Sequence, residues 1–138
     1  MITIGSKSRY GITAVLALTG HYGKGLVQIK ELAESGKIPR QYLAQILHTL
    51  LNAGVIQSVR GKNGGYKLSK APSELTALHV IEVLEGGILF GAELEGECCV
   101  VQELFNETEQ KMRESLSVSL EELYQRKQSS QKNVMYHI

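Results

Sequence analysis

A short glycine-rich stretch in the middle of the chain carries two cations at close spacing. It lies between two segments, Ile56–Val59 and Tyr66–Ser69, that we expect to form strands of a hairpin. Glycine and asparagine tolerate positive φ and therefore permit a tight tip. Cations on such a slender tip suit contact with a DNA backbone or minor groove, although an ordinary hairpin with solvated charges is the alternative. The tip residues assigned to DNA contact are Arg60, Lys62, Asn63, Gly64 and Gly65.

The distribution of charge supports a polyanionic partner. Residues 1–72 contain ten Lys or Arg and two Glu, a net charge of +8, whereas residues 73–138 contain five Lys or Arg and twelve Glu, a net charge of −7. A basic half of this kind is typical of a surface that meets nucleic acid, and the acidic half is expected to face away from it. Chance clustering on a solvated surface is the alternative, but the expected wing lies within the basic half.

Composition limits the other classes of function. At 138 residues, with 43% hydrophobic residues and no Trp, the chain suits one small domain with an appendage. It has no apolar run long enough to cross a membrane and no signal-peptide layout at its start, so we expect a cytoplasmic protein without a membrane partner. Adjacent cysteines, Cys98 and Cys99, do not suit the disulfide framework of a secreted protein.

The sequence offers no constellation typical of an enzyme. Its four histidines are scattered, it has no aspartate, and it contains neither a phosphate-binding loop nor a nucleophile elbow. We therefore expect a non-enzymatic protein whose histidines are solvent-facing or structural.

Three helices are expected before the hairpin. The first, Ser8–Thr19, has Lys7, Arg9 and Tyr10 at its start, where free backbone N–H groups favour phosphate. A short amphipathic helix, Val27–Glu34, is followed by the breaker 35–37 and by a helix from Pro39 to about Asn52. Two helices joined by a tight turn, and followed at once by a hairpin, predict a winged helix-turn-helix. The outward side of the second of these two helices carries Arg40, Gln41, Ala44, Gln45 and His48.

The remainder of the chain is expected to be mostly helical. Thr76 can cap a helix Ala77–Glu85, and residues 86–97 read as a loop. A long helix, Cys99–Leu116, has a narrow apolar stripe that we expect to pack against the same helix of a second subunit; packing on its own domain is the alternative. The capping box Ser119–Glu122 predicts a last helix to about Lys127, and residues 128–133 read as a polar linker before an apolar tail, residues 134–138, that docks elsewhere. The stripe comprises Val101, Leu104, Phe105, Thr108, Met112, Ser115 and Leu116.

Several motifs together resemble the Rrf-two family of bacterial winged-helix regulators, whose members include IscR, NsrR and CymR. The resemblance covers residues 1–86, and the C-terminal part is most similar to the CymR-type branch. The motifs are Arg9-Tyr10-Gly11-Ile12, Ile38-Pro39-x-x-Tyr42-Leu43-x-Gln45-Ile46-Leu47, Ala53-Gly54-Val55-Ile56, Ser58-Val59-Arg60-Gly61-x-x-Gly64-Gly65-Tyr66-x-Leu68 and Met135-Tyr136-x-Ile138.

The resemblance implies a homodimer that binds a near-palindromic stretch of double-stranded DNA. Arg60 would enter the minor groove, and Gly64 with Gly65 would let the backbone approach the duplex. Residues Arg40, Gln41 and Gln45 would face the major groove, while Lys7, Arg9 and Tyr10 would contact phosphates. Some members read bases with a glutamate at the position of Ala44, so sequence preference does not carry over.

The resemblance also raises an iron–sulfur cluster, which many members bind through three cysteines. This chain has only Cys98 and Cys99 in the corresponding loop, and adjacent side chains diverge, so no cofactor is assigned although a cluster stays open. Redox sensing by the thiol pair is a second possibility. In a third, the cysteines sense nothing, and a regulatory protein or a metabolite supplies the signal.

These observations predict a mainly α fold with a small β-hairpin, divided into a winged helix-turn-helix over residues 1–86 and a loop, dimerisation helix and tail over residues 87–138. The predicted function is that of a dimeric transcription regulator, expected to be a repressor, with a redox, iron–sulfur or cysteine-metabolism-linked signal. A winged-helix module that binds an acidic protein, without its own operator, is the alternative.

Overall fold

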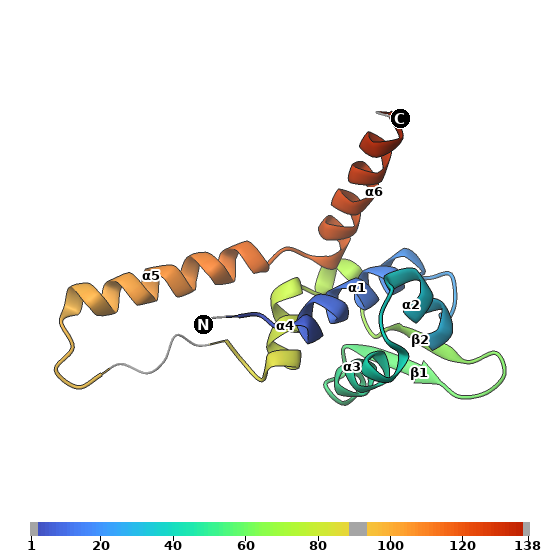
Figure 1. The fold of residues 1–138 in the computed structure, drawn as a ribbon, viewed down its shortest axis with the longest axis horizontal. Coiled ribbons are helices and arrows are strands. Elements are labelled where there is room, and N and C mark those ends of the chain that lie inside the picture. Colours follow the sequence, from blue (N-terminus) through green and yellow to red (C-terminus); the bar gives the residue numbers. More distant parts are fainter. Residues whose placement is uncertain (1–2, 89–93, 137–138) are drawn as a thin grey trace.

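The structure is a computed structural model that describes residues 3–88 and 94–136 (Figure 1). The described part is mainly helical with one two-stranded antiparallel sheet, which confirms the predicted fold class. None of its helices is long and apolar enough to span a bilayer. The elements are α1 (Ser6–Gly20), α2 (Ile29–Gly36), α3 (Arg40–Asn52), β1 (Ile56–Val59), β2 (Gly65–Leu68), a short 3-10 turn η1 (Pro72–Glu74), α4 (Ala77–Glu85), α5 (Cys99–Leu116) and α6 (Leu120–Tyr136).

The core forms where α1, α3 and α4 pack together beside α2 and the hairpin. In α3, the residues spaced at i, i+3, i+4 and i+7 are all buried, as the periodicity predicts. In α1, Gly11 lies directly under the Leu84 side chain of α4, so the lack of a Cβ lets these two helices approach closely. The buried apolar set comprises Ala14, Val15, Leu18, Val27, Leu32, Ile38, Leu43, Ile46, Leu47, Leu50, Val55, Ile56, Leu68, Leu75, Val80, Leu84 and Leu120.

The second helix begins and ends later than predicted. We predicted a helix over Val27–Glu34, but α2 starts at Ile29, because Val27 exchanges two backbone hydrogen bonds with Tyr66 in the hairpin. Gln28 is extended and occupies the N-cap position, but its side chain makes no hydrogen bond to the helix. The helix ends at Gly36, and the next residue, Lys37, has a φ of 52° in the left-handed region. Residues 35–36, predicted as part of a breaker, are therefore the last helical turn.

The bounds of α1, α3 and β2 differ from the predicted ones by a residue or two. Pro39 precedes α3 as its N-cap rather than opening the first turn, and β2 runs over Gly65–Leu68 rather than Tyr66–Ser69. The Ala77–Glu85 helix is confirmed, with the Thr76 hydroxyl accepting from the His79 N–H at 3.1 Å. At each of these positions the predicted type of element is present, and only residues at the ends of elements differ.

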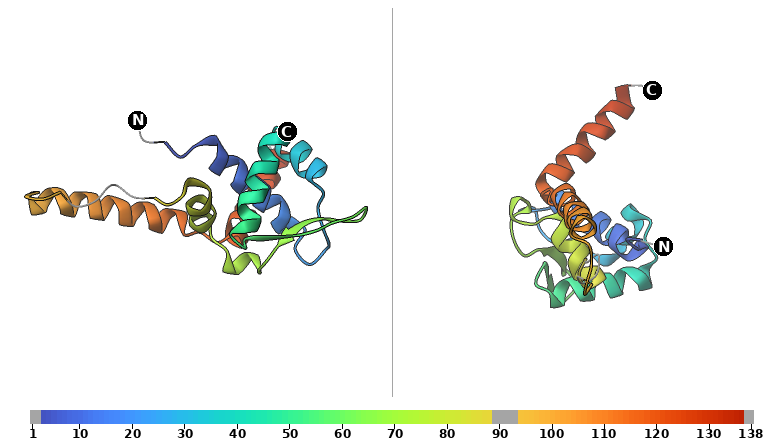
Figure 2. Two further views of the ribbon diagram at one scale, coloured as in Figure 1. Left: turned by 90° about the horizontal axis from the view of Figure 1, so that it is seen from below. Right: turned by 90° about the vertical axis from the view of Figure 1, so that its left-hand side faces the viewer.

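Two helices extend from this core in different directions (Figures 1 and 2). The bounds of α5 are as predicted, and none of its residues is buried. The last helix, α6, continues to Tyr136, so the polar linker predicted over residues 128–133 is wrong. The segment contains no Gly or Pro that would end the helix, and its Gln and Lys residues are good helix formers. Side chains of the predicted docking tail, residues 134–138, lie outside the described residues.

The base of α6 is part of the winged-helix core. Leu120 is fully buried, and its N–H donates to the Leu75 carbonyl at 2.9 Å. Tyr124, one turn later, lies against Gly20 at the end of α1. Ser119 caps the helix by accepting from the Glu122 N–H at 3.1 Å, as half of the predicted capping box. The division of the chain at residue 86 stays a prediction, but Leu120 contributes to the core formed by residues 14–84.

Leu120→Ala should lower the free energy of unfolding by about 2–5 kcal/mol, because it leaves a cavity where α6 enters the core. Gln125→Ala, an exposed change on the same helix, should stay within about 0.5 kcal/mol of the parent. Urea denaturation at one fixed protein concentration measures both. Equal midpoints for the two variants would mean that the base of α6 does not support the core.

Candidate nucleic-acid interface

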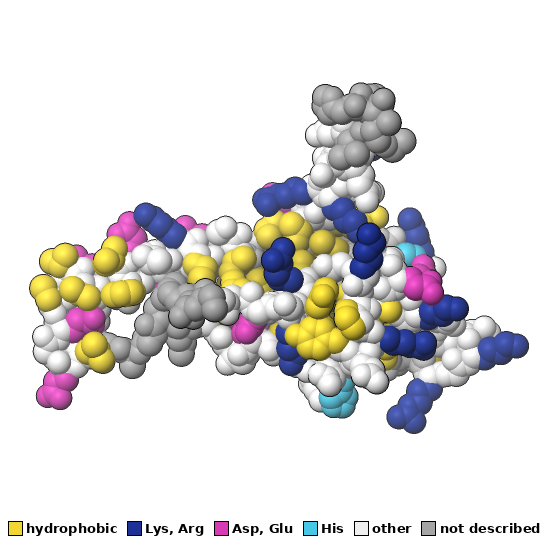
Figure 3. Space-filling view, in the orientation of Figure 1, with side chains coloured by type: hydrophobic (Ala, Val, Ile, Leu, Met, Phe, Trp, Pro, Cys, Tyr) yellow, Lys and Arg dark blue, Asp and Glu magenta, His cyan; other side chains and the backbone are white. Residues whose placement is uncertain are grey.

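The tip of the hairpin presents its cations to solvent. Antiparallel pairing ends at Val59 and Gly65, and the intervening residues form the tip. A backbone hydrogen bond of 3.0 Å from the Gly64 N–H to the Gly61 carbonyl closes it. Arg60 and Lys62 are exposed, and Figure 3 shows Lys and Arg side chains projecting at this end of the molecule. The tip therefore has the shape expected of a wing.

The two glycines at the base of the wing have a structural role in the hairpin itself. Gly64 is buried, and a Cβ there would collide with the Val59 carbonyl oxygen. A Cβ on Gly65, whose φ is 155°, would lie 2.6 Å from the Val27 carbonyl oxygen. Both glycines thus permit close backbone packing inside the protein. Their approach to a duplex, implied by the resemblance, stays a prediction.

The outward face of α3 is polar and unobstructed. Arg40, Gln41, Ala44 and Gln45 are all exposed, while the opposite face of the helix is buried in the core. No carboxylate lies on α3. The Arg and Gln side chains on this face supply hydrogen-bond donors suited to base edges and phosphates.

An open cleft connects this helix with the wing. Its walls come from the starts of α2 and α3 and from the wing. They carry Lys30, Arg40 and Arg60, and we call this cleft the basic cleft. Gln28 links two of its walls, since its Nε2 donates to the Lys62 carbonyl at 3.4 Å. Cations from three separate elements therefore face one concave surface. Such an arrangement can hold an extended polyanion.

Lys30 and Gln28 are candidate contacts that the sequence reasoning missed. Starting the helix at Val27 concealed that Gln28 is the N-cap and that Lys30 lies in the first turn of α2. The first helix of a helix-turn-helix crosses the DNA backbone, so a cation at its start would have a phosphate within reach if this surface binds DNA. Both residues could have been predicted as contacts if the helix had been predicted to start at Ile29.

The predicted phosphate contacts at the start of α1 have mixed surroundings. Arg9 is exposed and Lys7 is half-buried. The Tyr10 ring packs edge-on against Tyr42 with centroids 5.6 Å apart, so it belongs partly to the core. These residues remain predicted contacts, with Arg9 the most accessible of them.

A carboxylate already occupies the N-terminus of α1. Glu85 Oε1 accepts from the Gly5 N–H at 3.0 Å and from the Ser8 hydroxyl at 2.6 Å. It satisfies donors that would otherwise be free to meet a phosphate, and it adds a negative charge. Any phosphate contact from this helix therefore depends on its side chains rather than on its backbone terminus.

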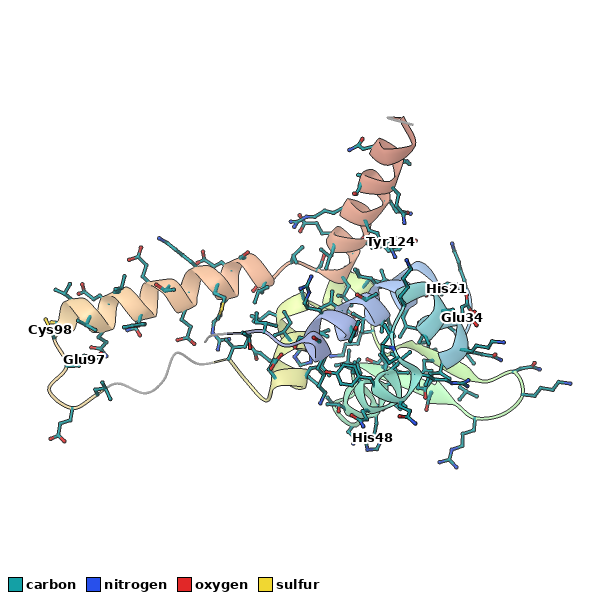
Figure 4. All side chains as sticks on the ribbon, viewed as in Figure 1. His21, Glu34, His48, Glu97, Cys98 and Tyr124 are labelled. Carbon is teal, nitrogen blue, oxygen red and sulfur yellow. The ribbon has the colours of Figure 1, made fainter. Side chains whose placement is uncertain are left out.

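The histidines do not converge on a site. His21 Nδ1 lies 3.0 Å from the Ala17 carbonyl oxygen, and its Nε2 lies 3.6 Å from Glu31. His48 lies on the exposed side of α3, far from His21 (Figure 4). Across residues 3–88 and 94–136, no group of three or more His, Cys, Asp or Glu side chains is placed to hold a metal ion.

Cys98 and Cys99 lie at the start of α5, at the end of the molecule away from the wing (Figures 1 and 4). Both are exposed, and Cys98 is the N-cap of the helix. The pair alone does not provide the four ligands that a cluster usually requires, and no nearby third ligand exists among the described residues. The described part of the chain therefore does not fit a cluster by itself.

Comparison with known proteins agrees with the arrangement of wing, helix and long C-terminal helix. Residues 4–126 match the Rrf2 family, described as "Iron-dependent Transcriptional regulator". The chain belongs to this family of winged-helix transcriptional regulators. It is thus a transcriptional regulator and not an enzyme, and the predicted family is confirmed.

Individual relatives match over most of their length. The HTH-type transcriptional regulator CymR of Bacillus subtilis (strain 168) is 35% identical over 136 residues, which are 98% of this chain and 99% of that one. IscR of Photorhabdus laumondii subsp. laumondii is 34% identical over 125 residues, with coverage of 86% and 76%. The solved structure of B. subtilis CymR (YrzC), named the global cysteine regulator, has a TM-score of 0.84 at 36% identity and covers 91% of this chain and 98% of its own.

Gly64→Ala should destabilise the protein by about 1–3 kcal/mol, because the new methyl group has to displace the Val59 backbone. The same displacement should speed hydrogen exchange at the amides of Val27 and Tyr66, which join the wing to the helices. Asn63→Ala, at the exposed neighbouring position, serves as the control and should leave both measurements near those of the parent. Unchanged exchange in Gly64→Ala would contradict the role given to this glycine.

Proposed function

We propose that this protein is a homodimeric repressor that occupies a near-palindromic operator in the cytoplasm. The observation that carries the proposal is the basic cleft, in which Arg40 at the start of α3 and Arg60 of the wing face a common surface. The exposed side of α3 lies in the major groove, and Arg60 enters the adjacent minor groove. The family assignment supports DNA as the partner.

Affinity and specificity have different sources in this proposal. Lys and Arg side chains around the cleft neutralise phosphates and release counterions, so binding weakens steeply as salt rises. Gln41 and Gln45 read base edges from α3, and Arg60 responds to the width of the minor groove. Ala44, also exposed on this face, offers only a methyl group. Arg60 therefore contributes to the choice of site as well as to overall affinity.

The proposed dimer forms through the apolar stripe of α5. Val101 and Leu104 are 41% and 58% exposed, and no residue of the helix is buried within its own chain. Exposed apolar side chains at this density mark an interaction surface. Antiparallel crossing of two such helices about Thr108 would place Val101 and Leu104 of one copy opposite Ser115 and Met112 of the other.

The thiol pair is the proposed point of signal entry. Cys98 and Cys99 are solvent-accessible and directly precede the exposed apolar residues Val100 and Val101. A peroxide can transfer one oxygen atom to a thiolate here, forming a polar sulfenic acid while the peroxide is reduced to water or an alcohol. The sulfenic acid would alter the edge of the proposed dimer surface. This mechanism needs no cluster ligands from elsewhere in the chain.

The competing function is a module that binds an acidic protein through the same basic surface. Gel shifts with random and genomic DNA at several salt concentrations separate the two. A regulator retains preference for particular genomic fragments as salt rises, whereas a protein-binding module shows only weak, sequence-independent binding. Absence of fragment preference would contradict the operator proposal.

Arg60→Ala should weaken operator binding by about 1–3 kcal/mol without changing stability, because the exposed side chain makes no contact needed by the core. The matched control is Lys132→Ala, which removes one positive charge from α6, on the side of the molecule opposite α3 (Figure 1). Fluorescence anisotropy with an operator fragment measures both. Equal affinities for Arg60→Ala and the parent would remove the wing from the proposed interface.

Leu104→Glu should convert the proposed dimer to a monomer, because it places a charge within the apolar stripe, opposite Met112 of the other copy. Loss of the second half-site should then reduce operator affinity by roughly 10²–10⁴. Asn106→Glu adds the same charge to the opposite side of α5 and should leave a dimer. Sedimentation velocity gives the oligomeric state, and a Leu104→Glu protein that stays dimeric would place the interface elsewhere.

A further inference from the structure

One guanidinium connects three segments where α5 meets the winged-helix core. Arg113 Nη1 donates to Glu82 of α4 at 2.7 Å, and its Nε donates to Glu109 of α5 at 3.1 Å. Its Nη2 donates to the carbonyl of Ile88 at 2.8 Å. The side chains of Arg113 and Glu82 are 32% and 34% exposed, so the pair is partly shielded from solvent.

This cluster is well placed to set the direction of α5. The helix buries none of its residues in its own chain, so apolar packing does little to fix its orientation. Its C-terminal end is joined to the core by the backbone around Ser119, which pairs with Thr76. That attachment fixes the position of one end of α5, and a second attachment is needed to fix the angle between α5 and the core. The Arg113–Glu82 pair provides it.

The other side of the cluster leads to the DNA-facing helix. Glu82 lies on α4, whose Leu84 packs over Gly11 of α1. The same Gly11 position also lies beside Ile46 of α3, and Ile46 and Leu84 belong to one core. The contact between Arg113 and Glu82 therefore fixes the orientation of α5 relative to α3, through the packed helices α4 and α1.

We propose that Arg113 is a positioning residue that fixes the angle between the winged helix and α5, and that it thereby sets the spacing of DNA half-sites accepted by the dimer. The inference rests on the proposed dimeric, operator-binding function. It concerns a residue outside the wing, outside α3 and outside the apolar stripe.

The chemistry of the guanidinium suits this task. Its planar fork can hold two carboxylates and a carbonyl in fixed directions, which a lysine ammonium cannot reproduce. Hydrogen bonds with Glu109 and Glu82 raise the pKa of Arg113, so its guanidinium stays charged across the physiological range. An 18-residue helix is about 27 Å long, so a small change of angle at its base moves its far end by several ångströms. Half-sites one DNA turn apart, about 34–36 Å, leave little tolerance for such a shift.

Two carboxylates on the same guanidinium provide a matched comparison. Glu82→Gln removes the charge that joins α5 to α4, whereas Glu109→Gln removes one that lies within α5 itself. Arg113→Gln removes the whole cluster, and Arg113→Lys keeps the charge but not the fork. Circular dichroism first confirms that each variant keeps its helices.

The first measurement uses spin labels at His48→Cys on α3 and Gln110→Cys on α5, in a Cys98→Ser, Cys99→Ser background. Labelled chains are diluted with unlabelled ones, so each distance lies within one chain. We expect one narrow distance distribution for the parent and for Glu109→Gln. We expect a broadened distribution for Glu82→Gln, Arg113→Gln and Arg113→Lys. Narrow distributions in all variants would overturn the inference whatever the protein binds.

The second measurement uses duplexes selected by the parent protein from random DNA, with the spacing between half-sites then changed one base pair at a time. The parent and Glu109→Gln should lose about tenfold or more in affinity at a wrong spacing, whereas Glu82→Gln and Arg113→Gln should lose about threefold or less. If Glu82→Gln and Arg113→Gln keep the spacing preference of the parent, the inference about Arg113 is overturned and the proposed function is not. Failure of the parent to select paired half-sites would instead contradict the proposed function, and the label distances would still judge the role of Arg113.

Discussion

Two backbone hydrogen bonds between Val27 and Tyr66 hold the wing against the helices, and the candidate DNA surface depends on them. The Val27 N–H donates to the Tyr66 carbonyl at 2.9 Å, and the Tyr66 N–H donates to the Val27 carbonyl at 2.8 Å. A two-stranded hairpin alone is marginally stable in water, so this third backbone segment gives it a fixed position. It also sets where α2 begins, since Val27 cannot be both paired and helical. One interaction thus orients the wing and the helix start that together line the basic cleft.

The free energy of the molecule is distributed unevenly along the chain. Residues of α1, α3 and α4 bury a continuous apolar core, to which Leu120 adds from α6. In contrast, α5 is stabilised within its own chain mainly by helical hydrogen bonds and exposed ion pairs such as Lys111 with Glu107, which contribute little. A helix that buries no residue in its own chain is only marginally stable alone, so formation of the proposed dimer would stabilise both the helix and the geometry it sets.

Local signals in the sequence were sufficient for most of the fold. The apolar spacing of α3, the Thr76 cap and the glycines of the wing each act over a few residues, and all three are present in the structure. Contacts between distant segments were not predictable in this way. The local sequence predicts a helical Val27, but in the structure Val27 pairs with the distant Tyr66. Residues 128–133 are uniformly polar, so they have no apolar periodicity from which the end of α6 could be predicted. For the candidate site, the cations of the wing and α3 were found from sequence, whereas Lys30 required the true start of α2.

The proposed signal site and the proposed DNA surface lie at opposite ends of the molecule (Figure 1). Oxidation of Cys98 or Cys99 cannot touch a duplex bound at the wing, so an effect on DNA affinity has to pass through α5. Two physical routes are available: a change in the fraction of dimer, or a change in the angle at which α5 leaves the core. Neither requires α3 or the wing to refold, because both alter only how two intact winged helices are presented to paired half-sites. The fraction of dimer depends on protein concentration, whereas the angle of α5 within a chain does not. The effect of oxidation on DNA affinity therefore depends on protein concentration only in the first route.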